Sequence, residues 1–363
     1  MDKRIYGFDF LRGICAIGVA YYHILGWLGV SHIKLYNVGL YGVYIFFILS
    51  GASIYIAYSK KILAGYDLRK FLALRIFRLL PLFALVVMVE PLLNNNGTLT
   101  GYNLEFFQKA LLNISFYFGI GNPGKISLVT GGWSLGIEFL FYLIFPTILG
   151  FVSASTFSGT ILLAGVFTLQ VIFVRYQIPG PEALVKSWSD YIQLASFLSY
   201  FIAGCLIGRY LNFRHVSKAA LYSQLAAWAL FCILLLIILM TSSNFAEASV
   251  IGKRGVLLPV ICFLLVIAAA KLDFIGKFKV IASGLGNMSY GMYLLHPLIF
   301  SFTMKFAPEF IKRNSVSCAT VLIICTGICA LLVDHYFERP INIFGKRVFD
   351  NKRNDVVRQT STG

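Results

Sequence analysis

The sequence is poor in charged residues. Only 13% of its 363 residues are Asp, Glu, Lys or Arg, whereas 58% are hydrophobic. A soluble domain has about 25% charged residues, so this chain lacks roughly half of the usual polar coat. This shortage argues against a soluble globular enzyme, a disordered chain and an ordinary nucleic-acid-binding protein.

The sequence also lacks the spacings that mark disulfide frameworks and metal sites. Its seven cysteines lie in apolar segments or at their edges, with no Cys-x-x-Cys pair and no His/Cys cluster. We therefore expect no disulfide framework and no bound metal. The N-terminus is not expected to be a cleaved signal peptide, because Asp9 and Arg12 interrupt the place of its apolar core.

What the chain does contain is a series of long apolar runs. A helix needs about 20 apolar residues to cross the hydrocarbon of a bilayer, whereas a β-barrel would show alternating strands of about ten residues. The runs predict an all-α polytopic membrane protein with about ten transmembrane helices. The stretch 105–120 is apolar but punctuated by Glu105 and Lys109, which favours an interfacial or re-entrant helix. The predicted spans are about 10–30, 38–58, 71–93, 131–150, 158–177, 191–210, 219–240, 255–270, 284–304 and 316–335.

Lysine and arginine are distributed unevenly between the two sets of loops. Of the 31 such residues, 20 lie in one set and ten in the other, with Arg12 inside the first span. Because cytoplasmic loops are enriched in Lys and Arg, this bias places both termini in the cytoplasm and accounts for much of the net charge of +16. We expect a membrane domain over residues 1–345 and a disordered cytoplasmic tail over residues 346–363.

The first span holds three ionisable residues, which are costly in a membrane and therefore candidates for function. Arg12 and His23 are eleven residues apart, so they lie about 20° apart on one helix face and about 16 Å apart along the axis. Asp9 can pair with Arg12 on that face. The pattern predicts a polar passage from the cytoplasm to mid-membrane. Alternatively, Asp9 and Arg12 anchor the helix at the interface and His23 is satisfied within the bundle.

Arg75 and Arg78 open the third span. Three residues apart, they share one helix face and can bind the phosphate of a cytosolic ligand. The alternative is simple anchoring of the helix at the cytoplasmic surface.

A polar seam runs along the fourth span, where Ser134, Glu138 and Tyr142 follow the spacing i, i+4, i+8. Glu138 has no cation nearby in the sequence, so it needs a proton or a partner such as His23 or an arginine. His296 precedes Pro297, which frees a backbone carbonyl one turn earlier, and a packing role for this histidine is the favoured interpretation.

The residues together resemble the acyltransferase-3 family of membrane acyltransferases. The opening Phe8-Asp9-Phe10-Leu11-Arg12-Gly13, with His23 after ten intervening residues, is similar to the start of that family. Further blocks agree in order: Gly42 to Gly51; Arg75-Ile76-Phe77-Arg78 with Pro81; Trp133-Ser134-Leu135 with Glu138, Phe141 and Tyr142; Ser289-Tyr290 to Pro297, followed by Glu338-Arg339-Pro340. The resemblance extends from about residue 6 to residue 340.

The resemblance implies an O-acyltransferase of the bacterial inner membrane. Such an enzyme moves an acyl group, often acetyl, from cytosolic acyl-coenzyme A to a hydroxyl of a cell-surface or lipid-linked carbohydrate. His23 would be the essential histidine, interpreted as the general base, with Glu138 orienting it or balancing its charge. Arg12, Arg75 and Arg78 would bind the acyl-coenzyme A, which is a co-substrate and not a tightly bound cofactor.

Four further residues are expected to line the substrate path: Asp9, Ser134, Tyr142 and His296. Two other functions stay open. One is a secondary transporter that uses Asp9, His23 and Glu138 as a proton relay, although no internal repeat or matched pair of broken helices supports it. The other is a catalytically silent scaffold for polysaccharide assembly.

Overall fold

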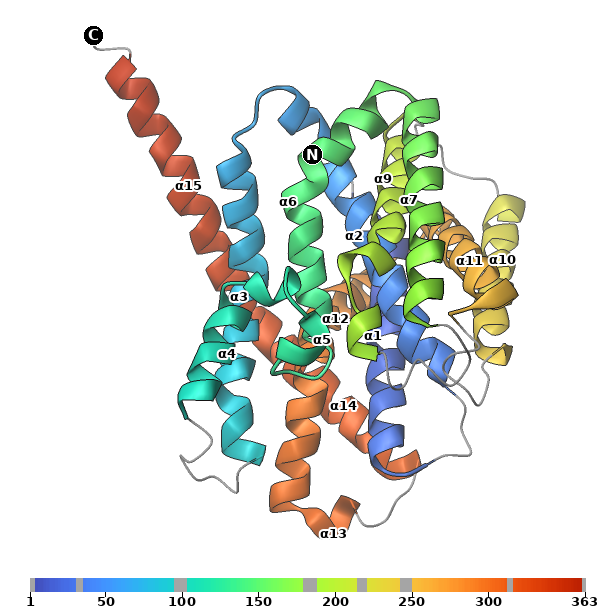
Figure 1. The fold of residues 1–363 in the computed structure, drawn as a ribbon, viewed down its shortest axis with the longest axis vertical. Coiled ribbons are helices and arrows are strands. Elements are labelled where there is room, and N and C mark those ends of the chain that lie inside the picture. The colour runs from blue at the N-terminus through green and yellow to red at the C-terminus, as the bar shows by residue number, and fades with distance from the viewer. Residues whose placement is uncertain are drawn as a thin grey trace.

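The computed structural model describes residues 4–30, 35–94, 103–178, 188–213, 221–241, 250–311 and 316–360. These residues form a bundle of helices without a strand (Figure 1). The longer helices are α1 (Tyr6–Trp27), α2 (Tyr36–Leu63), α3 (Leu68–Asn94), α6 (Trp133–Ala154), α7 (Thr156–Gln177), α9 (Leu198–Phe213), α10 (Leu221–Met240), α11 (Gly252–Lys271), α12 (Lys277–Phe306), α14 (Val316–Val333) and α15 (Arg339–Thr360). The short elements are α4 (Leu104–Ile114), η2 (Tyr117–Gly119), α5 (Pro123–Ile126), η3 (Leu194–Ser196), α13 (Pro308–Ile311) and η5 (Asp334–Glu338).

The predicted fold class is confirmed: the chain is an all-α polytopic membrane protein. Among the described residues, eight helical segments are long and apolar enough to cross a membrane, the last of them running through α14, η5 and the start of α15. Each of the ten predicted spans coincides with a helix. The two that are not among the eight are α9, which has only 16 residues, and α12, which has 30 residues but polar side chains in its middle turns.

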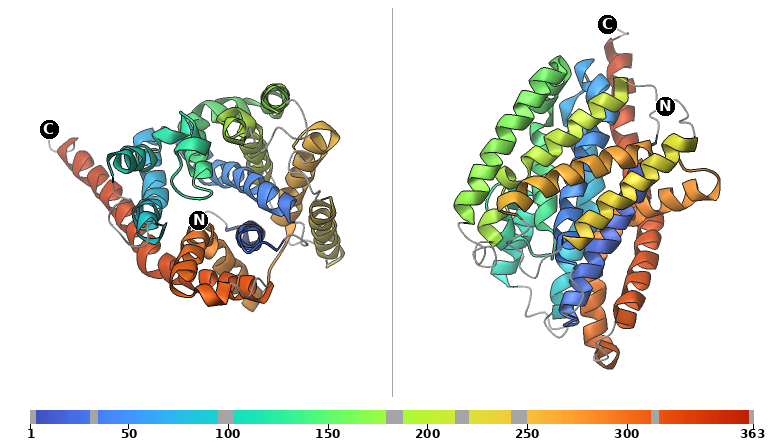
Figure 2. Two further views of the ribbon diagram at one scale, coloured as in Figure 1. Left: turned by 60° about the horizontal axis from the view of Figure 1, so that its bottom comes forward. Right: turned by 90° about the vertical axis from the view of Figure 1, so that its right-hand side faces the viewer.

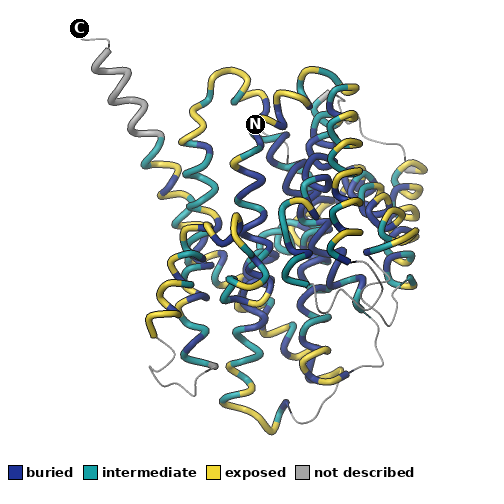
Figure 3. The backbone as a smooth tube through the Cα atoms, viewed as in Figure 1, coloured by how far each residue is buried: buried dark blue, intermediate teal, exposed yellow. Residues whose placement is uncertain are grey.

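The outer helices present apolar side chains to their surroundings. Figure 3 shows exposed stripes along α7 and α10, and these stripes consist largely of residues such as Phe157, Ile172, Leu225 and Ile233. Exposed aliphatic and aromatic faces of this size suit contact with lipid and not with water. The buried residues gather instead around α1, α2, α9 and α12 at the centre of the bundle.

Close helix packing at the centre depends on small residues. On α2, a Cβ at Gly51 would lie 2.1 Å from the backbone oxygen of Phe201 on α9. On α9, a Cβ at Gly204 would lie 2.0 Å from the backbone oxygen of Ile48 on α2. The two backbones therefore approach more closely than any side chain permits, as is common between membrane helices.

The start of α1 and the far end of α15 lie toward the same end of the bundle (Figure 2). Figure 1 shows that the link from α2 to α3 lies at this end too. This arrangement agrees with an even number of spans. The assignment of this end to the cytoplasm stays a prediction from the Lys and Arg bias.

The boundary at residue 345 and the disordered tail over residues 346–363 stay predictions. Residues 346–360 continue α15, and the first part of that helix packs against α3 through Phe77, whose ring lies 6.5 Å from Phe344 and 6.3 Å from Phe349. The last three residues lie outside the described part. The apolar contact with α3 holds the first part of α15 in place, which composition alone did not reveal.

The stretch expected to be interfacial or re-entrant contains α4 and η2. The side chain of Asn103 caps α4 by accepting a hydrogen bond from the backbone N–H of Phe106 at 2.8 Å. The Lys109 ammonium donates to Glu105 at 2.7 Å, which lowers the pKa of that carboxyl group. The helix packs beside α3, and its place relative to a bilayer stays a prediction.

Candidate functional site

A basic cavity of about 510 Å³ opens where α2 meets α3 and α15. Side chains of α1, α2, α3, α6, α12 and α15 line it. Among the described lining residues, six are cationic and one is acidic. The cations are Arg12, Lys61, Lys70, Arg75, Arg78 and Lys346, and the acid is Glu138. A cavity with this excess of positive charge suits a ligand that carries several negative charges.

Arg12 is fixed at the inner part of the cavity by contacts with α2. Its Nη2 donates to the backbone oxygen of Leu49 at 3.3 Å and to the hydroxyl of Ser53. Its Nη1 lies 3.6 Å from the carboxylate of Asp9, which also forms an ion pair with Arg4. Asp9 therefore orients Arg12 from behind. Asp9 is not among the residues that line this cavity, and its expected place on the substrate path stays a prediction.

Arg75 and Arg78 do lie on the cavity side of α3, as the spacing predicted. Nη2 of Arg75 donates to the hydroxyl of Tyr58 at 2.8 Å, and its guanidinium lies 5.0 Å from the centre of that ring. The buried Nε of Arg75 has no hydrogen-bond partner among the described residues. Arg78 is exposed to the cavity and makes no hydrogen bond or ion pair within the described part of the chain. Both arginines thus have N–H groups available to an anion.

The predicted polar seam of α6 faces the same cavity. Ser134, Glu138 and Tyr142 all line it. The carboxylate of Glu138 accepts hydrogen bonds from Ser50 at 2.9 Å and from the hydroxyl of Tyr142. No hydrogen bond or ion pair joins it to His23 among the described residues, and the expected role of Glu138 in orienting or charge-balancing that histidine stays a prediction. Its hydrogen-bond donors come from α2 and α6, and Arg12 of α1 interacts with it electrostatically, as the sequence allowed for an arginine of another span.

His23 has a different partner, His296. Nδ1 of His23 lies 2.9 Å from Nε2 of His296, and the two rings are nearly parallel, with centroids 5.1 Å apart. Trp27 stacks on both rings, at 5.5 Å from His23 and 5.8 Å from His296. His296 is fully buried, whereas His23 is partly exposed. The packing role expected for His296 therefore includes a direct contact with the candidate base.

The hydrogen bonds of this pair define its tautomers when both rings are neutral. Nδ1 of His296 lies 3.2 Å from the backbone oxygen of Met292, which can only accept, so this nitrogen carries the proton. Nε2 of His296 is then an acceptor, and Nδ1 of His23 must donate to it. The remaining nitrogen of His23, Nε2, is left with a free lone pair. That is the form of imidazole that can take a proton from a hydroxyl group.

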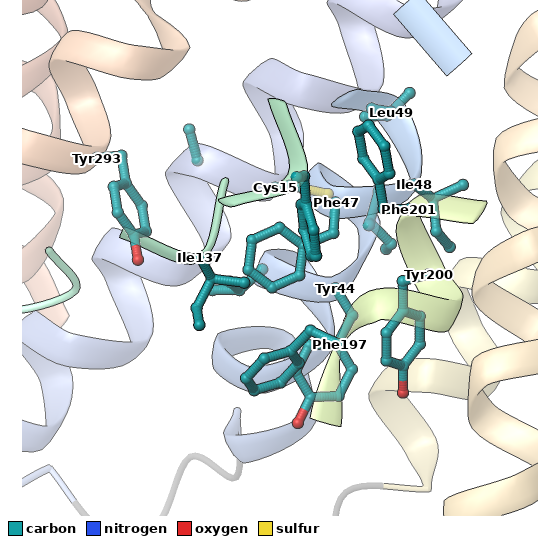
Figure 4. Close-up of a cluster of buried hydrophobic side chains, with 14 of the residues drawn as sticks. Cys15, Tyr44, Phe47, Ile48, Leu49, Ile137, Phe197, Tyr200, Phe201 and Tyr293 are labelled. Atoms are coloured by element: carbon teal, nitrogen blue, oxygen red, sulfur yellow. The ribbon is translucent and has the colours of Figure 1, made fainter. Parts of the chain in front are cut away.

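Tyr293 stands between the cavity and the histidine pair. Its hydroxyl donates to the backbone oxygen of Gly131 at 2.9 Å and lies 3.0 Å from the hydroxyl of Ser134. Its ring lies 6.0 Å from Phe46, which also lines the cavity, and 6.2 Å from His296. Figure 4 shows Tyr293 at one side of a cluster of buried hydrophobic side chains that includes Ile137 and Phe47.

Neither His23 nor His296 lines the basic cavity. The structure thus brings Arg12 into this cavity and leaves both histidines outside its lining, and the passage that joins them stays a prediction. Tyr293 of α12 lies next to both, since it lines the cavity and its ring lies 6.2 Å from His296. The cavity ends one aromatic ring short of the histidines.

Sequence reasoning missed several residues of the site. Lys61, Lys70 and Lys346 had been counted only as cytoplasmic loop and tail charges, and Tyr293 only as part of a motif. No sequence pattern around these residues indicates that they line the same cavity. Among the described residues, no group of three or more His, Cys, Asp or Glu side chains lies close enough together to hold a metal ion.

Comparison with known proteins decides the family. The model of the acyltransferase domain family, acyltransferase 3, matches residues 5–334. The chain belongs to this family. It is 29% identical to the Bacillus subtilis (strain 168) protein named "Putative peptidoglycan O-acetyltransferase YrhL", over 96% of this chain and 57% of that protein. It is 26% identical to the "Exopolysaccharide production protein ExoZ" of Rhizobium meliloti (strain 1021), over 74% of this chain and 79% of that protein.

The chain thus spans little more than half the length of the Bacillus protein that it matches. No solved structure matches this chain.

Proposed function

We propose that this acyltransferase moves an acyl group, most simply acetyl, from cytosolic acyl-coenzyme A to a hydroxyl of a cell-surface or lipid-linked carbohydrate at the bacterial inner membrane. The observation that carries the proposal is the pairing of two features: a cavity with three arginines, and a neutral histidine pair one ring beyond its inner end. The names of the two relatives support a carbohydrate acceptor.

The arginines supply the donor site in this proposal. Coenzyme A carries a pyrophosphate and a phosphate monoester, and guanidinium groups bind phosphate through charge-assisted, often bidentate hydrogen bonds. Arg75 and Arg78 present free N–H groups on one face of α3, and Arg12 lies farther in on α1. The thin thiol-bearing arm then extends inward along Arg12 toward Tyr293.

His23 acts as the general base. Its Nε2 takes the proton from the acceptor hydroxyl while the hydroxyl oxygen attacks the thioester carbonyl carbon. The carbon–sulfur bond then breaks, the ester forms, and the leaving thiolate recovers the proton from His23. His296 holds the ring of His23 in the required tautomer throughout. Tyr293 has to turn aside for the acyl group to reach this base.

Two other routes are distinguishable from this one. Transfer through an acyl-enzyme would leave labelled acyl group on the protein when donor is supplied without acceptor. A transporter would need Asp9, His23 and Glu138 to exchange protons. In the structure Asp9 is paired with Arg4 and Arg12, and no hydrogen bond joins Glu138 to His23 among the described residues, so the contacts favour transfer.

The test uses the full chain in membrane vesicles supplied with labelled acetyl-coenzyme A and the host's surface polysaccharide. We expect wild-type protein to label the carbohydrate and His23→Ala to abolish labelling. His335→Ala is the matched control, because His335 is exposed on η5 and remote in sequence from both histidines of the pair. Uptake of a solute that is lost in His23→Ala, with no acetyl transfer by wild type, would favour the transporter instead.

A further inference from the structure

The helix α15 lies beyond the residues that match the family, 5–334, yet it contributes a side chain to the basic cavity. That side chain is Lys346. The helix is held against α3 beside Gly345, where an added Cβ would lie 2.8 Å from the ring of Phe77. Since Phe77 sits between Arg75 and Arg78 in the sequence, this contact fixes α15 next to the arginine pair.

The turn that sets the direction of α15 is also well defined. It is a single π-helical turn, Asp334–Glu338, and Arg339 forms an ion pair with the buried Asp334 at 2.6 Å. Such turns insert an extra residue into a helix and change its direction. The Glu-Arg-Pro motif at 338–340 therefore has a structural role, which is to set α15 against α3.

The cations of the cavity fall into two groups along its depth. Arg12 bonds the middle of α2, whereas Lys61 lies in the last turn of α2 and Lys70 in the first turn of α3. Lys61 and Lys70 lie over aromatic rings, at 5.4 Å from Tyr58 and 5.6 Å from Tyr66. The lysines are thus near the mouth, where both helices end.

Lys346 adds a charge to the same cavity from a third helix, α15. It is exposed and makes no hydrogen bond or ion pair within the part of the chain that the structure describes. The one acidic residue among the described lining residues, Glu138, accepts its hydrogen bonds from Ser50 and Tyr142. The positive charge of Lys346 is therefore not neutralised by an acid of the cavity, which leaves it for an anion from outside.

We infer that Lys346, with Lys61 and Lys70, binds the 3′-phosphate of the acyl-coenzyme A, while the arginines bind its pyrophosphate. This inference rests on the proposed function, since it concerns the same donor. A nucleotide with two separate phosphate groups needs two cationic clusters, and lysine suits a phosphate monoester as a mobile point charge. An anionic phospholipid headgroup carries the same chemistry, so the test separates these two sources.

The test compares two donors in nanodiscs of neutral lipid: acetyl-coenzyme A and acetyl-dephospho-coenzyme A, which lacks only the 3′-phosphate. We expect Lys346→Ala to raise KM for acetyl-coenzyme A about tenfold, as loss of one charge-assisted contact does, with kcat unchanged. The same variant leaves KM for the dephospho donor unchanged. Lys346→Arg should restore most of the wild-type difference in KM between the two donors.

Arg347→Ala is the matched control, because Arg347 is the next residue of α15, is exposed and does not line the cavity. It should change neither KM. An equal rise in KM for both donors in Lys346→Ala would overturn the inference, since it would show that the lysine only holds α15 in place. An effect that appears only in discs containing anionic phospholipid would overturn it in favour of the headgroup.

Measuring binding without turnover distinguishes a failure of the proposed function from a failure of the inferred phosphate contact. Coenzyme A and dephospho-coenzyme A are titrated against the wild-type protein in the same discs. Wild-type protein that binds coenzyme A about tenfold more tightly but transfers nothing would support the phosphate contact and refute only the proposed reaction. Equal affinity for the two would refute the contact whatever the reaction.

Discussion

Nδ1 of His23 and Nε2 of His296 lie 2.9 Å apart, although 273 residues separate these histidines in the sequence. The contact exists because α1 packs along α12 through the length of the bundle. Other enzymes likewise use a fixed hydrogen-bond acceptor to hold a catalytic imidazole in one tautomer. The pair thus gives His23 a free Nε2, and no carboxylate of the described residues forms a hydrogen bond or ion pair with this histidine.

This pair predicts a graded response at position 296. His296→Ala removes the acceptor and should lower kcat for acetyl transfer about 100-fold, within the range that general-base catalysis supplies. His296→Gln keeps an acceptor at a similar reach and should retain at least about a tenth of the activity. KM for the donor should stay unchanged in both variants, because His296 does not line the cavity.

The measurement is steady-state acetyl transfer, with kcat and KM determined separately for each variant. An equal loss of kcat in His296→Ala and His296→Gln would refute the role of His296 as the hydrogen-bond acceptor for His23. A rise in donor KM without a fall in kcat would likewise argue that His296 belongs to the donor site.

Arg78 should matter mainly for donor binding. It makes no hydrogen bond or ion pair among the described residues, although it interacts electrostatically with the buried Glu338, and Arg78→Ala should raise donor KM by about tenfold or more. Because the lost interaction is electrostatic, the difference from wild type should shrink as salt is added. Titration of coenzyme A at two salt concentrations measures both effects, and a salt-independent defect would contradict this explanation.

Tyr293 should control access from the cavity to the histidines. Tyr293→Phe removes the hydrogen bonds to Gly131 and Ser134 but keeps the ring. It should loosen the barrier and increase hydrolysis of acetyl-coenzyme A in the absence of carbohydrate. Tyr293→Ala opens the end of the cavity further and should let a butyryl donor compete with acetyl. Unchanged hydrolysis and donor preference in both variants would show that the acyl group follows another route.

The close approach of α2 and α9 predicts a stability effect that is independent of function. A Cβ at Gly204 would fall 2.0 Å from a backbone oxygen, so Gly204→Ala should separate the helices and cost about 2 kcal/mol. Gly150→Ala is the control, because nothing lies within 4 Å of a Cβ placed there. Thermal unfolding in detergent checks this, and equal melting temperatures for the two variants would contradict the packing.

The patterns within single helices were sufficient to predict the parts of the site that one helix supplies. Arg75 with Arg78, and Ser134 with Glu138 and Tyr142, share a face because helical periodicity alone determines it. The apolar runs likewise predicted the helices of the bundle. These features depend on residues within a few turns of one another.

The features that the sequence did not reveal all depend on contacts between distant helices. The partner of His23 comes from α12, and Ser50 of α2 donates a hydrogen bond to Glu138 of α6. The barrier at Tyr293 could not be predicted from the sequence either, because it depends on how α12 packs against α6. Lys346 could be found only once α15 was known to pack against α3.

The central claim is that His23 serves as the base that esterifies a carbohydrate hydroxyl. Its most direct test is mass analysis of the surface polysaccharide from a host that lacks this gene and is complemented with wild type, His23→Ala or His335→Ala. The account predicts an acetyl-sized increment with wild type and His335→Ala, and none with His23→Ala at equal protein level. Restoration of the increment by His23→Ala would contradict it.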